Sequence, residues 1–303
     1  MYKVFDATKL GVRGSVFQLA PLIQKHGFEG IHCPADILND KNKAEDALRA
    51  VQEYDLKWGL LPTPIDFFTE TIEDIEFEKG LEILKAWAEI GEWLGIRYCY
   101  NHIWPSCELR SYDENFEWHV KCLERITAIL KPHGILYGFE FLGPYELRGN
   151  KFPFIHTLAG ILAIADAAGG DAGFLFDTYH WYCGNNVIDD IYLAAQNHHR
   201  MVCVHLNDGT KGIKKAEQRD LIRQMPMSTG IIDSAMIFSI FHDSGYIGPI
   251  MLEPMEPTCS RLASLPVEEV VIECAKVFKR VEENKMVMLP EMICIAAQKS
   301  LCN

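Results

Sequence analysis

The sequence predicts a single (β/α)8 barrel, the TIM-barrel fold of the α/β class, on three observations. Eight short apolar runs alternate with eight longer amphipathic stretches, which is the order of strands and helices in that fold. No linker rich in Pro, Gly or Ser interrupts the alternation, so we find no domain boundary. The length of 303 residues suits one barrel, which typically needs about 250 residues.

The apolar runs are the strand candidates. Several are apolar on both faces, as expected for strands of a parallel sheet that is covered on both sides. In chain order they are KVFDA, FEGIHCPAD, LKWGLLPTP, IRYCYNHIWP, ILYGFEFLGP, AGFLFDTYHW, MVCVHLND and PIMLEP. We expect these segments to form the inner ring of the barrel.

The amphipathic stretches between the strands predict helices. Several end in Gly just before the next strand, as at Gly27, Gly95 and Gly134, and Gly supplies the left-handed residue that ends a helix. The expected helices span residues 15–26, 40–54, 73–94, 113–131, 154–168, 187–198, 232–243 and 266–281. Residues 1–303 would form one barrel, with an apolar extension at about 284–303 that is either a final helix against the barrel or a subunit contact.

Composition excludes several classes of protein. The net charge is −13 and no basic run is present, whereas a nucleic-acid binder usually carries a basic stripe. No apolar run approaches the ~18 residues of a membrane span, and the first residues do not read as a signal peptide. None of the ten cysteines forms a CxxC pair. A disulfide framework is improbable in a chain this long, which favours a reducing compartment. We expect a cytoplasmic homo-oligomer, with a hetero-oligomer as the alternative, and neither nucleic-acid nor membrane partners.

Ligand-type residues end four consecutive predicted strands. Active-site residues of this fold come from the C-terminal strand ends, and the fifth to eighth strands end in Glu140, Asp177, His205 and Glu253. One such residue is usually a helix cap or a loop residue, but four on successive strands would share one mouth. Three buried carboxylates there would repel one another unless a cation compensates them. The set predicts one divalent ion; we expect Mn²⁺, with Mg²⁺, Co²⁺ or Zn²⁺ as alternatives.

The segments GFEFLGP, FDTYHWY, VHLND and LEP resemble those of the xylose isomerase-like barrel superfamily. The branch to which they are similar is the sugar phosphate isomerase/epimerase group, which includes ketose 3-epimerases and inosose dehydratases. The similarity runs from the first strand to Glu253, and segments 220–226 and 230–233 resemble the loop after the seventh strand in that group. Met227 and Ser228 depart from the Pro-Gly turn that is common there.

The resemblance implies a role for several of these residues. The four metal ligands would be Glu140, Asp177, His205 and Glu253. Glu140 and Glu253 would also act as acid and base on opposite faces of the substrate. His180 would hydrogen-bond a substrate oxygen, and Arg223 would reach a substrate oxygen or phosphate. From the residues alone, a capping His and a solvated loop Arg stay open as alternatives.

Position alone adds three candidate substrate contacts. His102 lies in the last part of the fourth predicted strand and would face the substrate or the metal. Trp181 would form an apolar wall against a sugar face, or pack under a loop. Asn207 ends the seventh strand beside His205, at the same mouth.

These residues predict a metal-dependent isomerase or epimerase that acts on a ketose, a related sugar or a sugar phosphate through an enediolate. The alternative is a lyase or dehydratase acting on an inosose or a 3-keto-glycoside, alone or with a partner subunit. A nuclease of the endonuclease IV type is the remote alternative, because residues 209–233 contain no DxH pair for a multi-zinc cluster. Neither the GxGxxG of a dehydrogenase nor the GxSxG of a serine hydrolase occurs.

Overall fold

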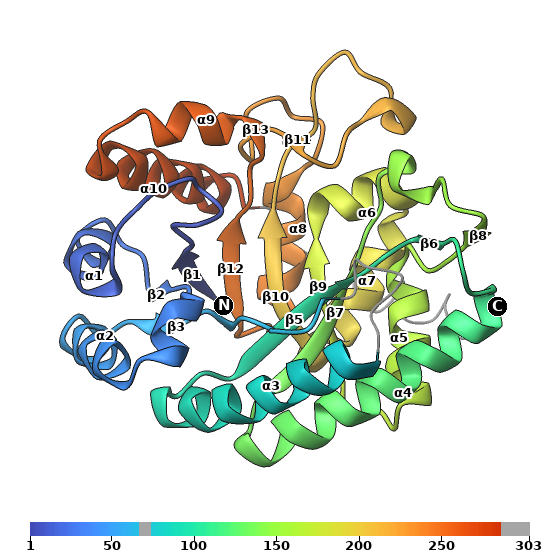
Figure 1. The fold of residues 1–303 in the computed structure, drawn as a ribbon. Helices are drawn as coiled ribbons and strands as arrows, with labels where there is room; N and C mark the ends of the chain where they lie inside the picture. The colour runs from blue at the N-terminus through green and yellow to red at the C-terminus, as the bar shows by residue number, and fades with distance from the viewer. Residues whose placement is uncertain (67–73, 286–303) are drawn as a thin grey trace.

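The strands of the computed structural model, which describes residues 1–66 and 74–285, form a parallel ring (Figure 1). Their order is β3-β2-β1-β12-β10-β9-β7-β5-β4. The ring closes at Gly59, because β3 (Lys57–Trp58) and β4 (Leu60–Leu61) flank this residue and pair with opposite neighbours. The other ring strands are β1 (Tyr2–Phe5), β2 (Gly30–Ile31), β5 (Tyr98–Ile103), β7 (Leu136–Phe141), β9 (Gly173–Asp177), β10 (Met201–Leu206) and β12 (Pro249–Leu252). The prediction of a (β/α)8 barrel is confirmed.

Helices surround the ring on its outer side (Figure 1). Those that overlap the eight predicted stretches are α1 (Val16–Lys25), α2 (Lys41–Glu53), α3 (Asp74–Leu94), α4 (Tyr112–Leu130), α5 (Leu158–Ala167), α7 (Ile188–Gln196), α8 (Ser234–Asp243) and α10 (Val267–Glu283). Side-chain caps define several of their first turns. Ser15 and Gln18, for example, form a reciprocal capping box at the start of α1. No helix among the described residues is both long and apolar enough to span a membrane.

Two short helices lie where the sequence does not predict them, α6 (Thr178–Gly184) and α9 (Thr258–Ala263). The predicted sixth strand, which extended to Trp181, ends at Asp177 instead. Its carboxylate accepts hydrogen bonds from the backbone N–H groups of Tyr179 at 2.6 Å and His180 at 2.8 Å. This N-cap starts α6 directly at the mouth of the barrel.

Two small strand pairs also lie outside the ring. β6 (Ser106–Cys107) pairs with β8 (Phe152–Pro153), and β11 (Ile222–Arg223) pairs with β13 (Glu256–Pro257). The first pair explains why α5 begins at Leu158 rather than at the predicted Phe154. The backbone N–H of Phe154 donates to the carbonyl of Pro105 at 2.7 Å, so this residue continues the loop pairing rather than a helix.

The barrel interior places the strand-end residues in a single layer. A buried cluster that includes Leu175, Cys203 and Met251 fills the centre of the ring. Side chains two residues apart on a strand point to the same face. Asp177, His205 and Glu253, each two residues further along its strand, therefore also point inward, above this apolar layer.

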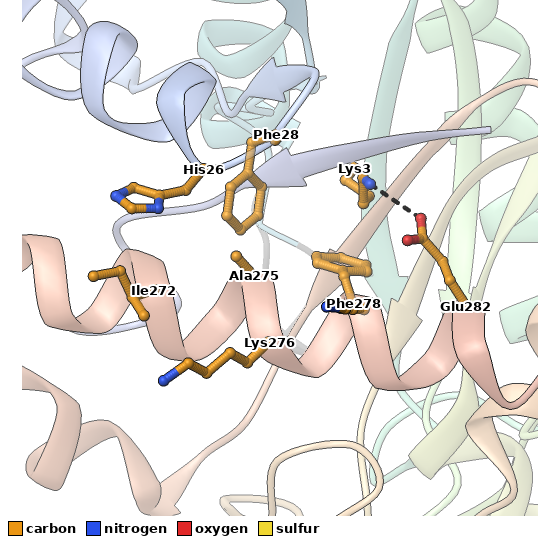
Figure 2. A pocket seen from close by; sticks show the side chains of 10 residues that line it. Lys3, His26, Phe28, Ile272, Ala275, Lys276, Phe278 and Glu282 are labelled. Atoms are coloured by element: carbon orange, nitrogen blue, oxygen red, sulfur yellow. Dashed lines mark hydrogen bonds and ion pairs between the residues drawn. The ribbon is translucent and has the colours of Figure 1, made fainter.

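On the outer side of the ring, α10 packs against α1 and α8. A hollow of about 390 Å³ lies between α10 and residues 26–28. Figure 2 shows Phe28 and Phe278 in its lining, and their rings meet edge to face with centres 5.8 Å apart. Lys3 pairs with Glu282 at 3.0 Å across the same contact. Residues 286–303 lie outside the described part of the chain, so the apolar extension and the extent of the single domain stay predictions.

One buried histidine in α4 predicts a pH-dependent stability. Burial lowers the pKa of His119 to about 3, although its Nδ1 lies 2.8 Å from the carbonyl of Asn115, a contact that raises the pKa. As the pH falls, this histidine gains a proton in the unfolded chain, where its pKa is about 6.5, before it gains one in the folded protein. The contribution to stability is therefore complete above about pH 6.5 and is lost as the pH falls towards 3.

We expect His119→Gln to remove this part of the pH dependence. Between pH 7.5 and 5.5 the wild type should lose on the order of 1 kcal/mol more unfolding free energy than the variant. Urea unfolding at both pH values measures the difference, with the exposed His199→Gln as control. Equal losses in wild type and His119→Gln would contradict the prediction.

Candidate metal centre

Four neighbouring strands bring the predicted ligands to one mouth. β7, β9, β10 and β12 are consecutive in the ring, and the register pairs His205 directly with Asp177. The resulting cluster consists of Glu140, Asp177, His205 and Glu253, whose potential ligand atoms all lie within 4.8 Å of one another. All four side chains are at most 2% exposed.

His205 lies between the two glutamates. Its Nδ1 is 3.3 Å from Oε1 of Glu140 and 3.3 Å from Oε2 of Glu253. The distance from the same nitrogen to Oδ2 of Asp177 is 3.8 Å. One imidazole nitrogen and one oxygen of each carboxylate thus converge on a common point.

Asp177 is held by contacts on both of its oxygens. Oδ1 caps α6, and Oδ2 accepts a hydrogen bond from Nδ2 of Asn207 at 2.8 Å. Asn207, predicted as a substrate contact, therefore orients a cluster carboxylate in this structure. Its own Oδ1 is buried and has no hydrogen-bond partner among the described residues.

Arg223 enters the cluster from the loop after β10. The β11–β13 pair positions its backbone, and the Tyr179 ring lies 5.0 Å from the guanidinium carbon. Nη1 donates to Oε2 of Glu253 at 2.6 Å and to Oδ2 of Asp177 at 3.1 Å. Burial by itself would lower the pKa of Arg223, but the negative charges of these carboxylates have the larger effect and raise it.

Two predicted histidines also border the cluster. His102 on β5 places Nε2 2.9 Å from Oε2 of Glu140. Nδ1 of His180 accepts the backbone N–H of Gly143 at 3.2 Å. Burial, with Arg223 beside it, lowers the pKa of His180 to about 4. Nε2 of the same ring lies 3.1 Å from Nη2 of Arg223, a group that can only donate, and 4.0 Å from Oε1 of Glu140.

Trp181 occupies a different environment. It is 6% exposed and belongs to the hydrophobic core, and its indole N–H donates to the carbonyl of Val187 at 2.9 Å. Among the contacts described for this side chain, none joins it to the cluster. The structure thus brings His102, His180, Asn207 and Arg223 together with the four ligand-type residues, but not Trp181.

Three polar residues near the ends of the first two strands also lie beside the mouth and are not predicted from the sequence. Asp6 directly follows β1, Lys9 lies in the turn after it, and His32 follows β2. Nζ of Lys9 pairs with Oε1 of Glu253, and Nδ1 of His32 lies 3.7 Å from Oδ2 of Asp6. The strand-end rule, applied to these two strands, would have found Asp6 and His32. Nothing in the local pattern singles out Lys9.

Asp208 holds the long loop that carries Arg223. Its carboxylate accepts hydrogen bonds from the backbone N–H groups of residues 229–232, at distances of 2.9 to 3.1 Å. Its backbone N–H and C=O pair with Gln224. A fully buried carboxylate with this many donors fixes both ends of the loop beside the mouth.

The cluster charges shift the pKa values of its members in opposite directions. Burial alone would raise the pKa of Glu140, but His102 and His205 outweigh it and hold that pKa well below its ordinary value. Burial, together with the nearby glutamates, raises the pKa of Asp177 well above its ordinary value, despite Arg223. Lys9 itself has a pKa well above the ordinary value, because Glu253 and its neighbours outweigh burial.

The residues present fit a divalent cation. Neither ring nitrogen of His205 has a hydrogen-bond partner within the described part of the chain, and the same holds for Oε1 of Glu140. Buried polar atoms are normally satisfied, and a cation bound between these atoms would satisfy them. One imidazole and three carboxylates form a donor set suited to Mn²⁺, Zn²⁺, Co²⁺ or Mg²⁺. The charges of half-buried Lys9 and buried Arg223 supply part of the compensation that the sequence predicts for a metal alone.

The fold and the cluster define a (β/α)8-barrel protein whose C-terminal mouth carries a site suited to a metal ion. The profile of the xylose isomerase-like TIM barrel family matches residues 21–281, and the chain belongs to that family. The resemblance stated from the strand-end segments is thereby confirmed.

Individual relatives are distant. An inosose isomerase of Halalkalibacterium halodurans is 26% identical over 146 residues, which are 48% of this chain and 48% of that protein. The matched stretch thus spans about half the length of that curated relative. The solved structure of the IOLI protein with a bound zinc atom superposes with a TM-score of 0.77 at 18% identity, covering 95% of this chain and 100% of that one. D-Psicose 3-epimerase from Clostridium cellulolyticum H10, solved with D-tagatose, gives a TM-score of 0.71 at 12% identity, over 94% and 100% of the two chains.

Proposed function

We propose that this protein is a divalent-metal-dependent isomerase or epimerase that acts on a ketose or a related cyclic sugar ketone. The observation that carries the proposal is the position of the two glutamates. Glu140 and Glu253 end the first and last of the four consecutive strands, and each places an oxygen 3.3 Å from the same nitrogen of His205. Family membership and the likeness to an inosose isomerase and a ketose 3-epimerase support the same class of reaction.

Glu140, Asp177, His205 and Glu253 would hold the metal ion, with Mn²⁺ as the ion we expect. When bound, such an ion polarises a carbonyl and stabilises the negative charge that develops next to it. The remaining chemistry falls to side chains of this chain. His180 would hydrogen-bond a substrate oxygen, and Arg223 fixes the carboxylates of Asp177 and Glu253.

Proton transfer is assigned to the glutamates. One carboxylate removes the proton from the carbon next to the carbonyl, which leaves an enediolate. The carboxylic acid of the other glutamate then delivers a proton to the opposite face of that carbon, which inverts it. Delivery to the neighbouring carbon would give an aldose–ketose isomerisation instead. No oxidant or reductant is needed, because the product is an isomer of the substrate.

Deuterium incorporation tests this proposal. Mn²⁺-loaded protein is incubated in D₂O with D-psicose, D-tagatose, an inosose and a 3-keto-glucoside, and the products are examined by NMR. We expect one deuterium at a carbon adjacent to the carbonyl in at least one of these compounds, and none after treatment with a chelator. Loss of water or of the anomeric group, with no epimer formed, would favour the dehydratase or lyase alternative. No exchange with any of these probes, with or without metal, would refute the proposed function.

A further inference from the structure

Lys9 is held rigidly in the turn that follows β1. The buried carboxylate of Asp6 accepts hydrogen bonds from the backbone N–H groups of Thr8 at 3.0 Å and Lys9 at 3.2 Å. On the other side, the Cys259 thiol donates to the carbonyl of Lys9 at 3.1 Å. Since the backbone is fixed from both directions, the lysine side chain extends over the mouth from a defined origin.

The ammonium of Lys9 contacts only one of the two oxygens of Glu253. It pairs with Oε1, and its side chain is 19% exposed. The other oxygen, Oε2, lies 3.3 Å from Nδ1 of His205 and 2.6 Å from Arg223. Lys9 is therefore paired with Oε1, the oxygen that does not face the other ligand-type residues. This ion pair leaves Oε2 available to a bound cation.

Glu140 has a different environment. Its described ion-pair neighbours are the imidazoles of His102 at 2.9 Å, His205 at 3.3 Å and His180 at 4.0 Å. None of these contacts involves the ammonium of a lysine. The two glutamates that the proposed function treats as acid and base are thus unlike: only Glu253 is paired with a lysine.

We propose that Lys9 is a positioning residue for Glu253 and a fixed counter-charge of the metal centre. This inference rests on the proposed function, in which Glu253 is both a ligand and a proton-transfer group. By holding Oε1, Lys9 keeps Oε2 directed at the other ligands. Its positive charge at the same time repels a divalent cation, so Lys9 lowers metal affinity while keeping Glu253 oriented for proton transfer.

This role predicts opposite effects on metal binding and on turnover. Lys9→Met should bind Mn²⁺ at least about tenfold more tightly, because one positive charge has left the cluster. Its proton exchange at saturating Mn²⁺ should nevertheless be at least about tenfold slower, because Oε1 has lost its partner. A lysine with a merely structural role would loosen the metal site when removed rather than tighten it. Lys9→Arg keeps the charge and should bind Mn²⁺ like the wild type.

Mn²⁺ titration followed by the EPR signal of the free ion measures the affinities. Lys279→Met, at an exposed position of α10, is the matched control for the same chemical change. Lys9→Gln, which can still donate a hydrogen bond to Oε1, replaces Lys9→Met if that variant fails to fold. Mn²⁺ affinity that is unchanged or weaker in these neutral variants would overturn the inference. If the wild type exchanges no deuterium with any probe, the proposed function fails, whereas the Mn²⁺ comparison still decides the role of Lys9.

Discussion

His205→Ala is expected to abolish metal binding and activity together while the barrel stays folded. His205 is the only nitrogen donor of the cluster, and its Nδ1 lies within 3.8 Å of all three carboxylates. Loss of residues that merely orient metal ligands typically costs about 10–100-fold in affinity, so loss of this proposed ligand should cost more. Metal content after dialysis should fall from about one ion per chain to nearly none.

Asp177→Asn should have a similar effect on metal content, because it replaces a charged ligand with a neutral one. Its amide still offers an oxygen to cap α6, so the local fold should persist. Metal analysis, far-UV circular dichroism and turnover with added Mn²⁺ are the measurements, and exposed His199→Ala is the control for His205→Ala. Normal metal content in both variants would show that the ligands are other residues. Global unfolding of both would instead indicate a metal with a structural role.

Glu140→Gln and Glu253→Gln should separate metal binding from proton transfer. Glutamine keeps the shape of the side chain and one oxygen donor but is not basic. Metal affinity should fall only in part, and rates compared at saturating Mn²⁺ isolate the chemical step. At equal metal content we expect turnover to fall by about 10²–10⁴-fold in each variant, the usual effect of losing a positioned acid or base.

Substrate exchange in D₂O should also distinguish the two glutamates. If they act on opposite faces, one variant should exchange the proton of one epimer only, and the other variant that of the opposite epimer. Glu256→Gln, an exposed carboxyl near the same mouth, is the matched control. Near-normal turnover in both saturated variants would move proton transfer to His180 or His102. It would also favour the dehydratase or lyase alternative.

Short helices were the weakest part of the sequence-based prediction. The sequence predicts FDTYHW as the end of a strand, because it continues an apolar run. In the structure the Asp177 carboxylate accepts two backbone hydrogen bonds as an N-cap, so a helix begins where the apolar run continues. That same cap places His180 in the first turn of α6, where it borders the cluster.

Lys9 shows a second limit of sequence reasoning. Its partner Glu253 lies 244 positions away, and the contact exists because β1 and β12 pair side by side in the ring. Trp181 shows the reverse: the sequence allows either a wall against a sugar face or packing under a loop, and the structure places its indole in the core.

By itself the sequence determined the barrel, the order of its strands and helices, and the four ligand-type residues at successive strand ends. It could do so because these features are periodic or local: strand and helix patterns repeat along the chain, and the fold directs every strand end to one mouth. Only the tertiary structure decided which charges meet there. The pairing of Glu253 with Lys9 and Arg223 depends on loops that approach from distant parts of the chain, and the pairing of Glu140 with His102 depends on the register of β5 beside β7. Their geometry follows from packing and hydrogen bonding, which no local pattern records.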